Sequence, residues 1–359
     1  MPITIDVLIV GQGLAGSLLV NALDAQGVRS LVLDPDATQA ASLAAAGTLN
    51  PCTGPRYSTP EPLLDWLQPA LATWTALGEQ LGAPLIRELP LVRLFRDSDE
   101  AALVRQRRAA DPAIADVLGA PRPGTPAGLA DAPGHVWQTA WQVDLPACLA
   151  RTRQRLIRDG RLIAAALPTQ QPLPIANRQQ LLALDLSGTR VQTRAIVLCL
   201  GGGAPALAEL HDLPWRLSRG EAVYLKAAAE YPAHGVSRRQ ALVPLRDGRY
   251  WLGANYLRVG RCDVQTDSDA SADAATRLSM LLAQPTVPHV VERRSGIRPG
   301  SRTNQPFCAP LPNQPGVYLF NGLGSRGSLL GPRCAAALAA HLARGAPLAP
   351  AWNPWQVAC

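Results

Sequence analysis

The fold is decided by the stretch VLIVGQGLAGSLL, residues 7–19, in which a continuous apolar run meets three glycines and a helix-forming segment. We expect residues 5–10 to form a buried parallel strand, because strands covered on both faces lack the polar alternation of exposed ones. Residues 17–23 are then expected to form a helix. The stretch predicts an α/β fold built around this junction of strand and helix.

Each of the three glycines has its own physical reason. Gly11 permits the tight turn from strand to helix, and Gly13 lets the backbone approach a diphosphate closely. Gly16 lets the helix pack against the strand. Leu14 and Ala15 stand where the first helical N–H groups and the helix dipole would face the phosphates.

An acidic residue stands at the distance that a dinucleotide site requires. A second expected strand, residues 29–33, ends at Asp34, whose carboxylate can accept hydrogen bonds from a ribose. Strand, glycine turn, helix, strand and acid therefore occur in the order of an adenine-dinucleotide site. The alternative is a tight turn with incidental glycines.

The composition sets limits on the class of protein. The chain of 359 residues is long enough for two cores or for one large α/β domain with an insertion. Its net charge of +7 is spread along the sequence, so a nucleic-acid surface built from arginine pairs stays an open but less favoured interpretation. The seven cysteines include no CxxC pair, which favours reduced thiols in the cytoplasm and argues against a zinc site. We expect no bound metal and no membrane span.

The segment ASLAAAGTLNPCTGPRYS, residues 41–58, points to the kind of dinucleotide. Its small residues would let the backbone pass beside a flat ring system. Here the sequence resembles the D-amino-acid oxidase and glycine oxidase superfamily of FAD enzymes, in which such a segment lies along the flavin. The resemblance implies that Ala46, Gly47 and Asn50 contact FAD, which would be bound non-covalently, with Cys308 as a buried packing residue.

The resemblance covers the chain from end to end. Six further segments match motifs of the superfamily in the right order: residues 64–77, 193–205, 216–227, 247–256, 294–312 and 319–342. It implies a Rossmann-like FAD-binding domain of the glutathione-reductase type, with an inserted substrate domain that contains a mixed or antiparallel sheet. The FAD domain would comprise residues 1–84, 140–215 and 291–359, and the substrate domain residues 85–139 and 216–290. Residues 111–134, rich in Pro and Gly, are expected to form a solvated surface loop.

The later motifs supply the remaining contacts to the flavin. The resemblance implies that Gly201 and the turn at 322–327 lie against the cofactor, with the N-terminus of a helix at 328–342 facing negative charge on the flavin ring. The alternative for the turn is an ordinary helix N-cap at Ser325. The cofactor contacts predicted from this turn are Gly322, Gly324, Ser325, Arg326 and Gly327.

Three residues are candidates for catalysis. Arg298 matches the arginine that can pair with a substrate carboxylate in glycine-oxidase-like proteins, and a structural role is its alternative. Arg326 would place a second cation near the ring, or lie on the surface. Tyr256 would line the pocket or pack in the core.

The resemblance implies an FAD-dependent oxidoreductase that oxidises a C–N bond of an amino acid or secondary amine by hydride transfer to flavin N5. Oxygen or a quinone would be the electron acceptor. Residues 324–327 also resemble the oxidase half of a bifunctional enzyme that acts on the side chain of tRNA wobble uridines, so a tRNA-borne amine is one alternative. Departures from the superfamily's usual residues at Ala254, Thr303 and Leu323 keep a second alternative open, a non-catalytic FAD-binding redox partner.

Overall fold

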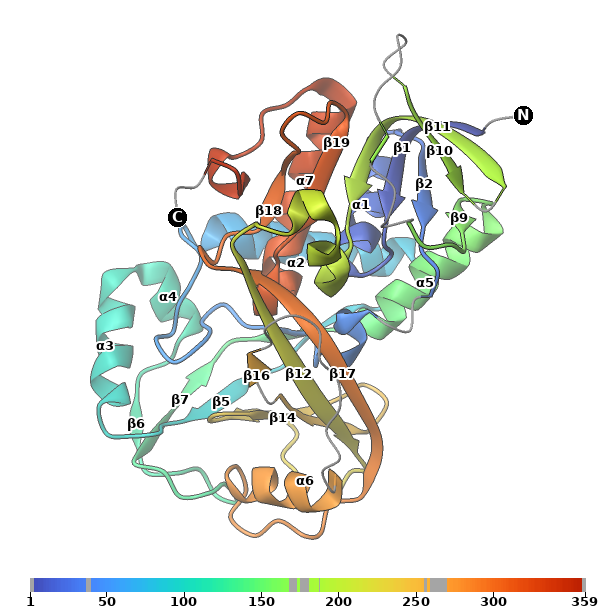
Figure 1. Cartoon of the computed structure of the whole chain (residues 1–359). Helices are drawn as coiled ribbons and strands as arrows, with labels where there is room; N and C mark the ends of the chain where they lie inside the picture. The colour runs from blue at the N-terminus through green and yellow to red at the C-terminus, as the bar shows by residue number, and fades with distance from the viewer. Residues whose placement is uncertain are drawn as a thin grey trace.

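The computed structural model describes residues 3–36, 40–167, 173–174, 181–186, 188–254, 257–258 and 270–356. Within these residues the strands form three sheets, of seven, nine and three strands. In Figure 1 the seven-stranded sheet and its helices occupy the upper half of the molecule and the nine-stranded sheet the lower half. Among the helices of the described segments, none is both long enough and apolar enough to cross a membrane.

The seven-stranded sheet, called the first sheet below, contains the N-terminal stretch. Its main order is β18-β19-β11-β1-β2-β9, and β10 pairs with β11. Parallel pairing joins β1 to both β2 and β11, and residues 7–10 of β1 are fully buried, which confirms the prediction of a buried parallel strand. The strands are β1 (Ile3–Val10), β2 (Ser30–Leu33), β9 (Leu162–Ile163), β10 (Leu182–Leu186), β11 (Thr189–Leu198), β18 (Phe307–Pro310) and β19 (Val317–Asn321).

Helices pack closely beside the first sheet. They are α1 (Leu14–Ala25), α2 (Leu64–Gln80), α5 (Leu145–Arg158) and α7 (Gly327–Arg344). A Cβ on Gly327 would lie 2.7 Å from Cδ2 of Leu14, and one on Gly331 would lie 2.6 Å from Cδ1 of Leu18. Because these glycines are four residues apart on one face of α7, they let the two helices approach closely.

The nine-stranded sheet, called the second sheet below, is mixed, as expected. Strand β5 runs parallel to β13, and the other pairings are antiparallel. The strands are β5 (Leu91–Leu94), β6 (Arg122–Pro123), β7 (Gly134–Gln138), β12 (Trp215–Leu225), β13 (Gly235–Ser237), β14 (Ala241–Pro244), β15 (Tyr250–Gly253), β16 (Leu257–Arg258) and β17 (Val290–Ser301).

Strands β12 and β17 form a long ribbon that runs diagonally through the lower half of Figure 1. One face of the ribbon, with Val223 and Leu225, packs against α6 (Ala270–Ser279). The opposite face, with Ala222 and Tyr224, packs against Ala46 and is called the inner face below. Since β17 pairs with β12 but also contacts segments of the upper half, the boundaries of the two domains stay a prediction.

Short elements complete the fold. The three-stranded sheet consists of β3 (Thr48–Leu49), β8 (Trp141–Val143) and β4 (Ile86–Glu88), and α3 (Glu100–Ala110) and α4 (Pro112–Val117) lie beside the second sheet. The 3-10 helices are η2 (Ala41–Ala44), η3 (Gly201–Ala206), η4 (Ala208–Leu210), η5 (Gly324–Arg326) and η6 (Pro350–Trp352).

The expectation of a solvated loop at residues 111–134 was wrong for much of the segment. It contains α4 and β6, and Leu129 and Ala130 are buried in the core beneath the second sheet. The N–H of Ala130 donates to the carbonyl of Leu281, so the segment is held by residues far along the chain.

Candidate functional site

The glycine turn after β1 is closed by backbone contacts. Gly11 has a φ of +100°, and a Cβ there would overlap the carbonyl oxygen of Cys199 at the end of β11. A Cβ on Gly16 would overlap the carbonyl oxygen of Gly11. Gly13 differs, because the only atom of the described residues within 4 Å of its Cβ position is Cβ of Ala40, at 3.9 Å. Gly11 and Gly16 therefore shape the turn, and Gly13 leaves space beside it.

Helix α1 begins directly after this turn. It starts at Leu14, earlier than predicted, with Gly13 as its N-cap and no side-chain hydrogen bond to the first turn. Leu14 is buried against α7, whereas Ala15 is half-buried. The first N–H groups of α1 thus remain available to an anion.

Asp34 lies where the sequence predicts the ribose acceptor, at the end of β2. Its Oδ2 accepts a hydrogen bond of 2.7 Å from the N–H of Gln12, and its Oδ1 accepts one of 2.9 Å from Nη1 of Arg153. The Asp34 side chain is largely buried. Sequence reasoning missed both partners: Gln12 is a variable position of the glycine motif, and Arg153 lies on α5, far along the chain.

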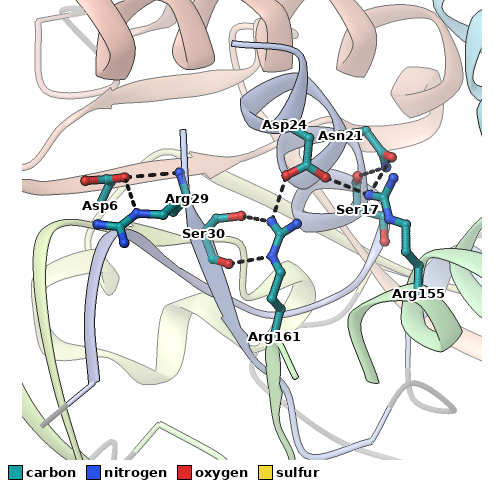
Figure 2. Close-up of polar contacts among 8 residues, drawn as sticks. All are labelled: Asp6, Ser17, Asn21, Asp24, Arg29, Ser30, Arg155 and Arg161. Carbon is teal, nitrogen blue, oxygen red and sulfur yellow. Dashed lines mark hydrogen bonds and ion pairs between the residues drawn. The ribbon is translucent and has the colours of Figure 1, made fainter. Parts of the chain in front are cut away.

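A second group of ion pairs joins α5 to α1. Nη2 of Arg155 lies 2.9 Å from Oδ2 of Asp24, and Nη2 of Arg161 lies 2.8 Å from Oδ1 of the same carboxylate. Figure 2 shows Asp24 between these two arginines, with Arg161 also donating to Ser30. Because Asp24 stands in the last turn of α1, where a negative charge opposes the helix dipole, the two cations compensate an otherwise unfavourable position.

The glycine turns that follow β11 and β19 are joined by Asn321. Its Nδ2 donates to the carbonyl of Gly201 at 3.1 Å, and its Oδ1 accepts from the N–H of Gly322 at 2.9 Å. Both glycines have positive φ values, of +56° and +72°. Because β11 and β19 are parallel neighbours, their turns meet at the edge where α/β proteins bind ligands. Asn321 is buried, and the sequence analysis did not identify it.

Residues 41–47, called the small-residue loop below, are held by the inner face of the second sheet. The carbonyl of Leu43 accepts hydrogen bonds from the hydroxyl of Tyr224 at 2.8 Å and from Nη1 of Arg294 at 3.1 Å. The carbonyl of Ala44 accepts one of 2.9 Å from Nε1 of Trp251. These side chains turn the carbonyls of the loop toward the second sheet.

The end of the small-residue loop is held by the three-stranded sheet. The carbonyl of Ala46 accepts from Nε2 of Gln142 at 3.2 Å, and that of Gly47 accepts from the N–H of Val143 at 2.8 Å. Gly47 has a φ of +71°, and a Cβ there would overlap the carbonyl oxygen of Val143. Asn50 uses its Oδ1 to accept from the N–H two residues ahead, at 3.0 Å, so it shapes the following turn.

The side chains of Tyr224, Arg294 and Trp251 that hold the small-residue loop are called the clamp below. A charged network extends from the clamp along the inner face. Oε1 of Glu292 accepts from Nε of Arg294 at 2.5 Å, and its Oε2 accepts from Nη1 of Arg249 at 2.8 Å. Burial alone would raise the pKa of Glu292, but the hydrogen bonds with these two arginines outweigh it and hold the pKa below its ordinary value. Burial raises the pKa of Tyr224, so its phenol stays protonated and donates.

Arg298 stands on the inner face of β17, between the small-residue loop and the turn at 322–327. Residues two apart on a strand share a face. A Cβ on Gly296 would lie 2.7 Å from Cα of Ala41, and one on Gly300 would lie 3.7 Å from Cα of Gly324. Arg298 is half-buried between these two close approaches. The structure thus brings together the two segments that the sequence assigned to the flavin, with this arginine between them.

The other predicted residues of the C-terminal turn have different surroundings. Nη2 of Arg326 donates to the carbonyl of Asn304 at 2.7 Å, and burial lowers the pKa of its guanidinium below the ordinary value, although the group stays charged at neutral pH. Ser325 is exposed, and it is not the N-cap, since α7 begins at Gly327 after Arg326. Tyr256 lies outside the described residues.

The thiols and the acidic groups limit the chemistry of the site. Cys308 is fully buried, and burial raises the pKa of its thiol, so the thiolate needed for a covalent bond to a cofactor is disfavoured. Within the part of the chain that the structure describes, no group of His, Cys, Asp and Glu side chains is arranged to hold a metal ion.

The residues at the edge of the first sheet fit an adenine dinucleotide. The open space at Gly13, the uncapped start of α1 and the carboxylate of Asp34 are adjacent, as a diphosphate and its ribose require. The profile of the FAD-dependent oxidoreductase family, abbreviated DAO, matches residues 6–341. The chain belongs to this family. It is an FAD-dependent oxidoreductase.

Two curated relatives align with most of the chain. The glycine oxidase of Pseudomonas aeruginosa is 25% identical over 344 positions, which cover 91% of each protein. The tRNA 5-methylaminomethyl-2-thiouridine biosynthesis bifunctional protein MnmC of Aeromonas hydrophila is 24% identical over 390 positions. That match covers 96% of this chain but only 56% of the relative, so the chain spans little more than half of it.

The fold is that of solved FAD-dependent oxidases. The crystal structure of glycine oxidase from Geobacillus kaustophilus superposes with a TM-score of 0.78 at 21% sequence identity, and the match covers 98% of each chain. At this level of identity the likeness shows the fold alone. It confirms the predicted Rossmann-like architecture with an inserted second sheet.

Proposed function

We propose that this FAD-dependent oxidoreductase oxidises a C–N bond of an amino acid or secondary amine that carries a carboxylate. The observation that carries the proposal is the position of Arg298, half-buried on the inner face between the small-residue loop and the turn at 322–327. A guanidinium binds a carboxylate through two parallel hydrogen bonds, so it fixes orientation as well as charge. The glycine oxidase relatives support the same substrate class.

Each part of the site would have a separate role in the proposed oxidation. Bound FAD would take the two electrons released when the C–H bond next to nitrogen breaks. Arg298 would hold the substrate carboxylate, and the N-terminus of α7 with Arg326 would stabilise negative charge nearby. The second sheet would exclude water from the substrate. Molecular oxygen or a quinone is the proposed acceptor, and the five buried, unpaired cysteines of the described segments support a reducing, cytoplasmic location.

Anaerobic reduction of the flavin tests the proposal. Purified protein is mixed without oxygen with glycine, sarcosine, proline, iminodiacetate and D-amino acids, and the absorbance of oxidised flavin is followed. We expect at least one of them to bleach the flavin. Failure with the whole panel would contradict the proposed substrate class.

Variants of β17 test the role of Arg298 once a substrate is found. Arg298→Gln should lower kcat/KM by roughly 30-fold or more, mainly through KM, because a charged hydrogen-bonded pair is lost. Arg298→Lys should recover part of the loss, since it restores the charge but not the two-pronged geometry. Arg293→Gln is the matched control, because Arg293 lies on the other face of the same strand and pairs with Glu221. Equal effects of Arg298→Gln and Arg293→Gln would refute the assignment.

A second candidate is an amine carried on tRNA. Residues 214–220, 296–306 and 322–330 meet around the β12–β17 ribbon, and they contain five arginines and no acidic residue. The bifunctional tRNA-modification relatives cover most of this chain, which favours the same candidate. If tRNA is the substrate, its binding must weaken steeply as salt rises, with a linear dependence of log affinity on log salt. Binding that is insensitive to salt would exclude this candidate.

A further inference from the structure

Three polar residues at the edge of the first sheet form one hydrogen-bonded unit. Nη1 of Arg153 donates to Oδ1 of Asp34 at 2.9 Å and also lies 3.2 Å from Oε1 of Gln12. The N–H of Gln12 donates to Oδ2 of Asp34 at 2.7 Å, which closes the unit. Arg153 thus contacts both the predicted ribose acceptor and the residue inside the glycine turn.

The unit leaves little freedom to the Asp34 carboxylate. Each of its oxygens accepts one donor from the protein, and each oxygen keeps a lone pair for a further donor. The Gln12 side chain is fully buried and is itself held, because its Nε2 donates to Oγ of Ser17 and to the carbonyl of Leu149, both at 3.0 Å. The direction in which Asp34 offers its remaining lone pairs is therefore set by two donors, one from the glycine turn and one from α5.

The negative charge of the Asp34 carboxylate also depends on Arg153. A carboxylate that is largely removed from water is stable in that place only with a cation or several donors beside it. Among the described residues, Arg153 is the cation paired with Asp34. Without it, the carboxylate would keep the N–H of Gln12 as its one donor described above, and rotation toward water about the Cβ–Cγ bond would break only that hydrogen bond.

We propose that Arg153 is a positioning residue for FAD, which fixes the orientation in which Asp34 accepts the hydroxyls of the adenosine ribose. The inference concerns the nucleotide end of the cofactor and is independent of the substrate proposed above. It rests on the assignment of Asp34 as the ribose acceptor, which the same experiment tests.

A neighbouring arginine on α5 provides the control. Arg155 lies two residues after Arg153, and it pairs with Asp24 at the same distance of 2.9 Å (Figure 2). Removing Arg155 should therefore weaken the docking of α5 on α1 to a similar extent, while it leaves Asp34 and its donors in place. A role of Arg153 in docking alone would make the two variants alike.

The experiment compares two cofactors on the full chain after removal of FAD. Binding of FAD and of an analogue with a 2′,3′-dideoxyadenosine end is measured by the change in flavin fluorescence. Wild-type protein should prefer FAD by about tenfold or more, because hydrogen bonds to a charged acceptor are lost with the analogue. Asp34→Asn and Arg153→Gln should both reduce this preference to about threefold or less.

Two further variants complete the test. Arg153→Lys should retain part of the preference, because it keeps a cation but loses the planar guanidinium, whose Nη1 contacts Asp34 and Gln12 and whose Nη2 donates to the Asp34 carbonyl. Arg155→Gln should retain the wild-type preference, even where its thermal stability falls as much as that of Arg153→Gln. An Arg153→Gln protein that binds both cofactors more weakly but keeps the full preference would overturn the proposal. Absence of any preference in the wild type would overturn the assignment of Asp34 and the proposal with it.

Discussion

The glycine turn at residues 11–16 and the clamp on the small-residue loop are built in opposite ways. In the glycine turn, a Cβ at Gly16 would overlap the backbone of Gly11, so the requirement lies within six residues of sequence. In the clamp, Tyr224 and Trp251 hold the carbonyls of residues about 180 or more positions earlier in the chain. A site held by its own backbone leaves a fixed local spacing in the sequence, whereas the residues that hold the small-residue loop have no fixed spacing from it.

The largest expected effect breaks the glycine turn. Gly16→Ala places a methyl group against the Gly11 carbonyl, and we expect it to destabilise the protein by about 3 kcal/mol or more, with loss of bound FAD. Gly13→Ala is the matched variant, since among the described residues its Cβ meets only Cβ of Ala40, at 3.9 Å. It should fold with nearly unchanged thermal stability but bind FAD more weakly, because the methyl group occupies space that a diphosphate would need.

Thermal unfolding and FAD titration of the two glycine variants provide the measurement. If Gly13→Ala lost as much stability as Gly16→Ala, the division between a shaping glycine and a glycine that leaves space would be incorrect.

The clamp should respond more weakly, and its two hydrogen bonds should differ. Trp251→Phe removes the indole N–H that donates to the Ala44 carbonyl, at an expected cost of about 1–2 kcal/mol. Tyr224→Phe should cost about 0.5–1 kcal/mol, because Arg294 still donates to the carbonyl of Leu43. Chemical denaturation measures both values, and the visible spectrum of the bound flavin reports displacement of the loop. A larger loss for Tyr224→Phe would contradict the shared role of Arg294.

The smallest expected effect is a change in the stability of the protein at acidic pH. The folded pKa of Glu292 lies below its ordinary value of 4.5, so its ion pairs contribute stability above about pH 4.5 that is lost as pH falls through the folded pKa. Glu292→Gln should therefore be less stable than the wild type near neutral pH, and the difference should shrink as the pH falls below about 4.5. Urea unfolding at a series of pH values measures this difference, with Glu88→Gln, at the exposed last residue of β4, as the control. A difference that grows at low pH would contradict the sign of this shift.

The fold was predictable where a local sequence pattern already indicates the structure that distant contacts also favour. The buried strand at β1, the glycine turn and the acid after β2 were predicted and found, because each follows a local pattern in the sequence as well as making distant contacts, such as that of Gly11 with Cys199. Residues 111–134 were not, because Leu129 and Ala130 become buried only through contact with residues near 281, a pairing that no local pattern indicates.

The same reasoning explains which site residues the sequence analysis missed. Asn321 joins two glycine turns that are about 120 residues apart in sequence, and Arg153 reaches Asp34 across a similar separation. Arg153 lies in none of the segments that match the superfamily. Asn321 lies in one of them, but an isolated Asn, like an isolated Arg, is common on any strand end or helix and was not singled out. Arg298, by contrast, was found because it matches a motif residue to which the superfamily gives a role. The position of Arg298 between the small-residue loop and the turn at 322–327 came only from the structure.

The register of β12 with β17 determines on which face and at which height Arg298 lies. Arg298 stands opposite Ser218 in an antiparallel ladder that extends from Trp215 to Leu225. Deleting one residue before it would send the arginine to the face of Ile297, which packs against Gly202, and deleting two would keep its side but displace it along the strand by about 6–7 Å. Insertions and deletions of two residues in this ribbon would therefore offer evolution, or an engineer, discrete steps for accommodating a longer or shorter substrate while the cofactor stays where it is.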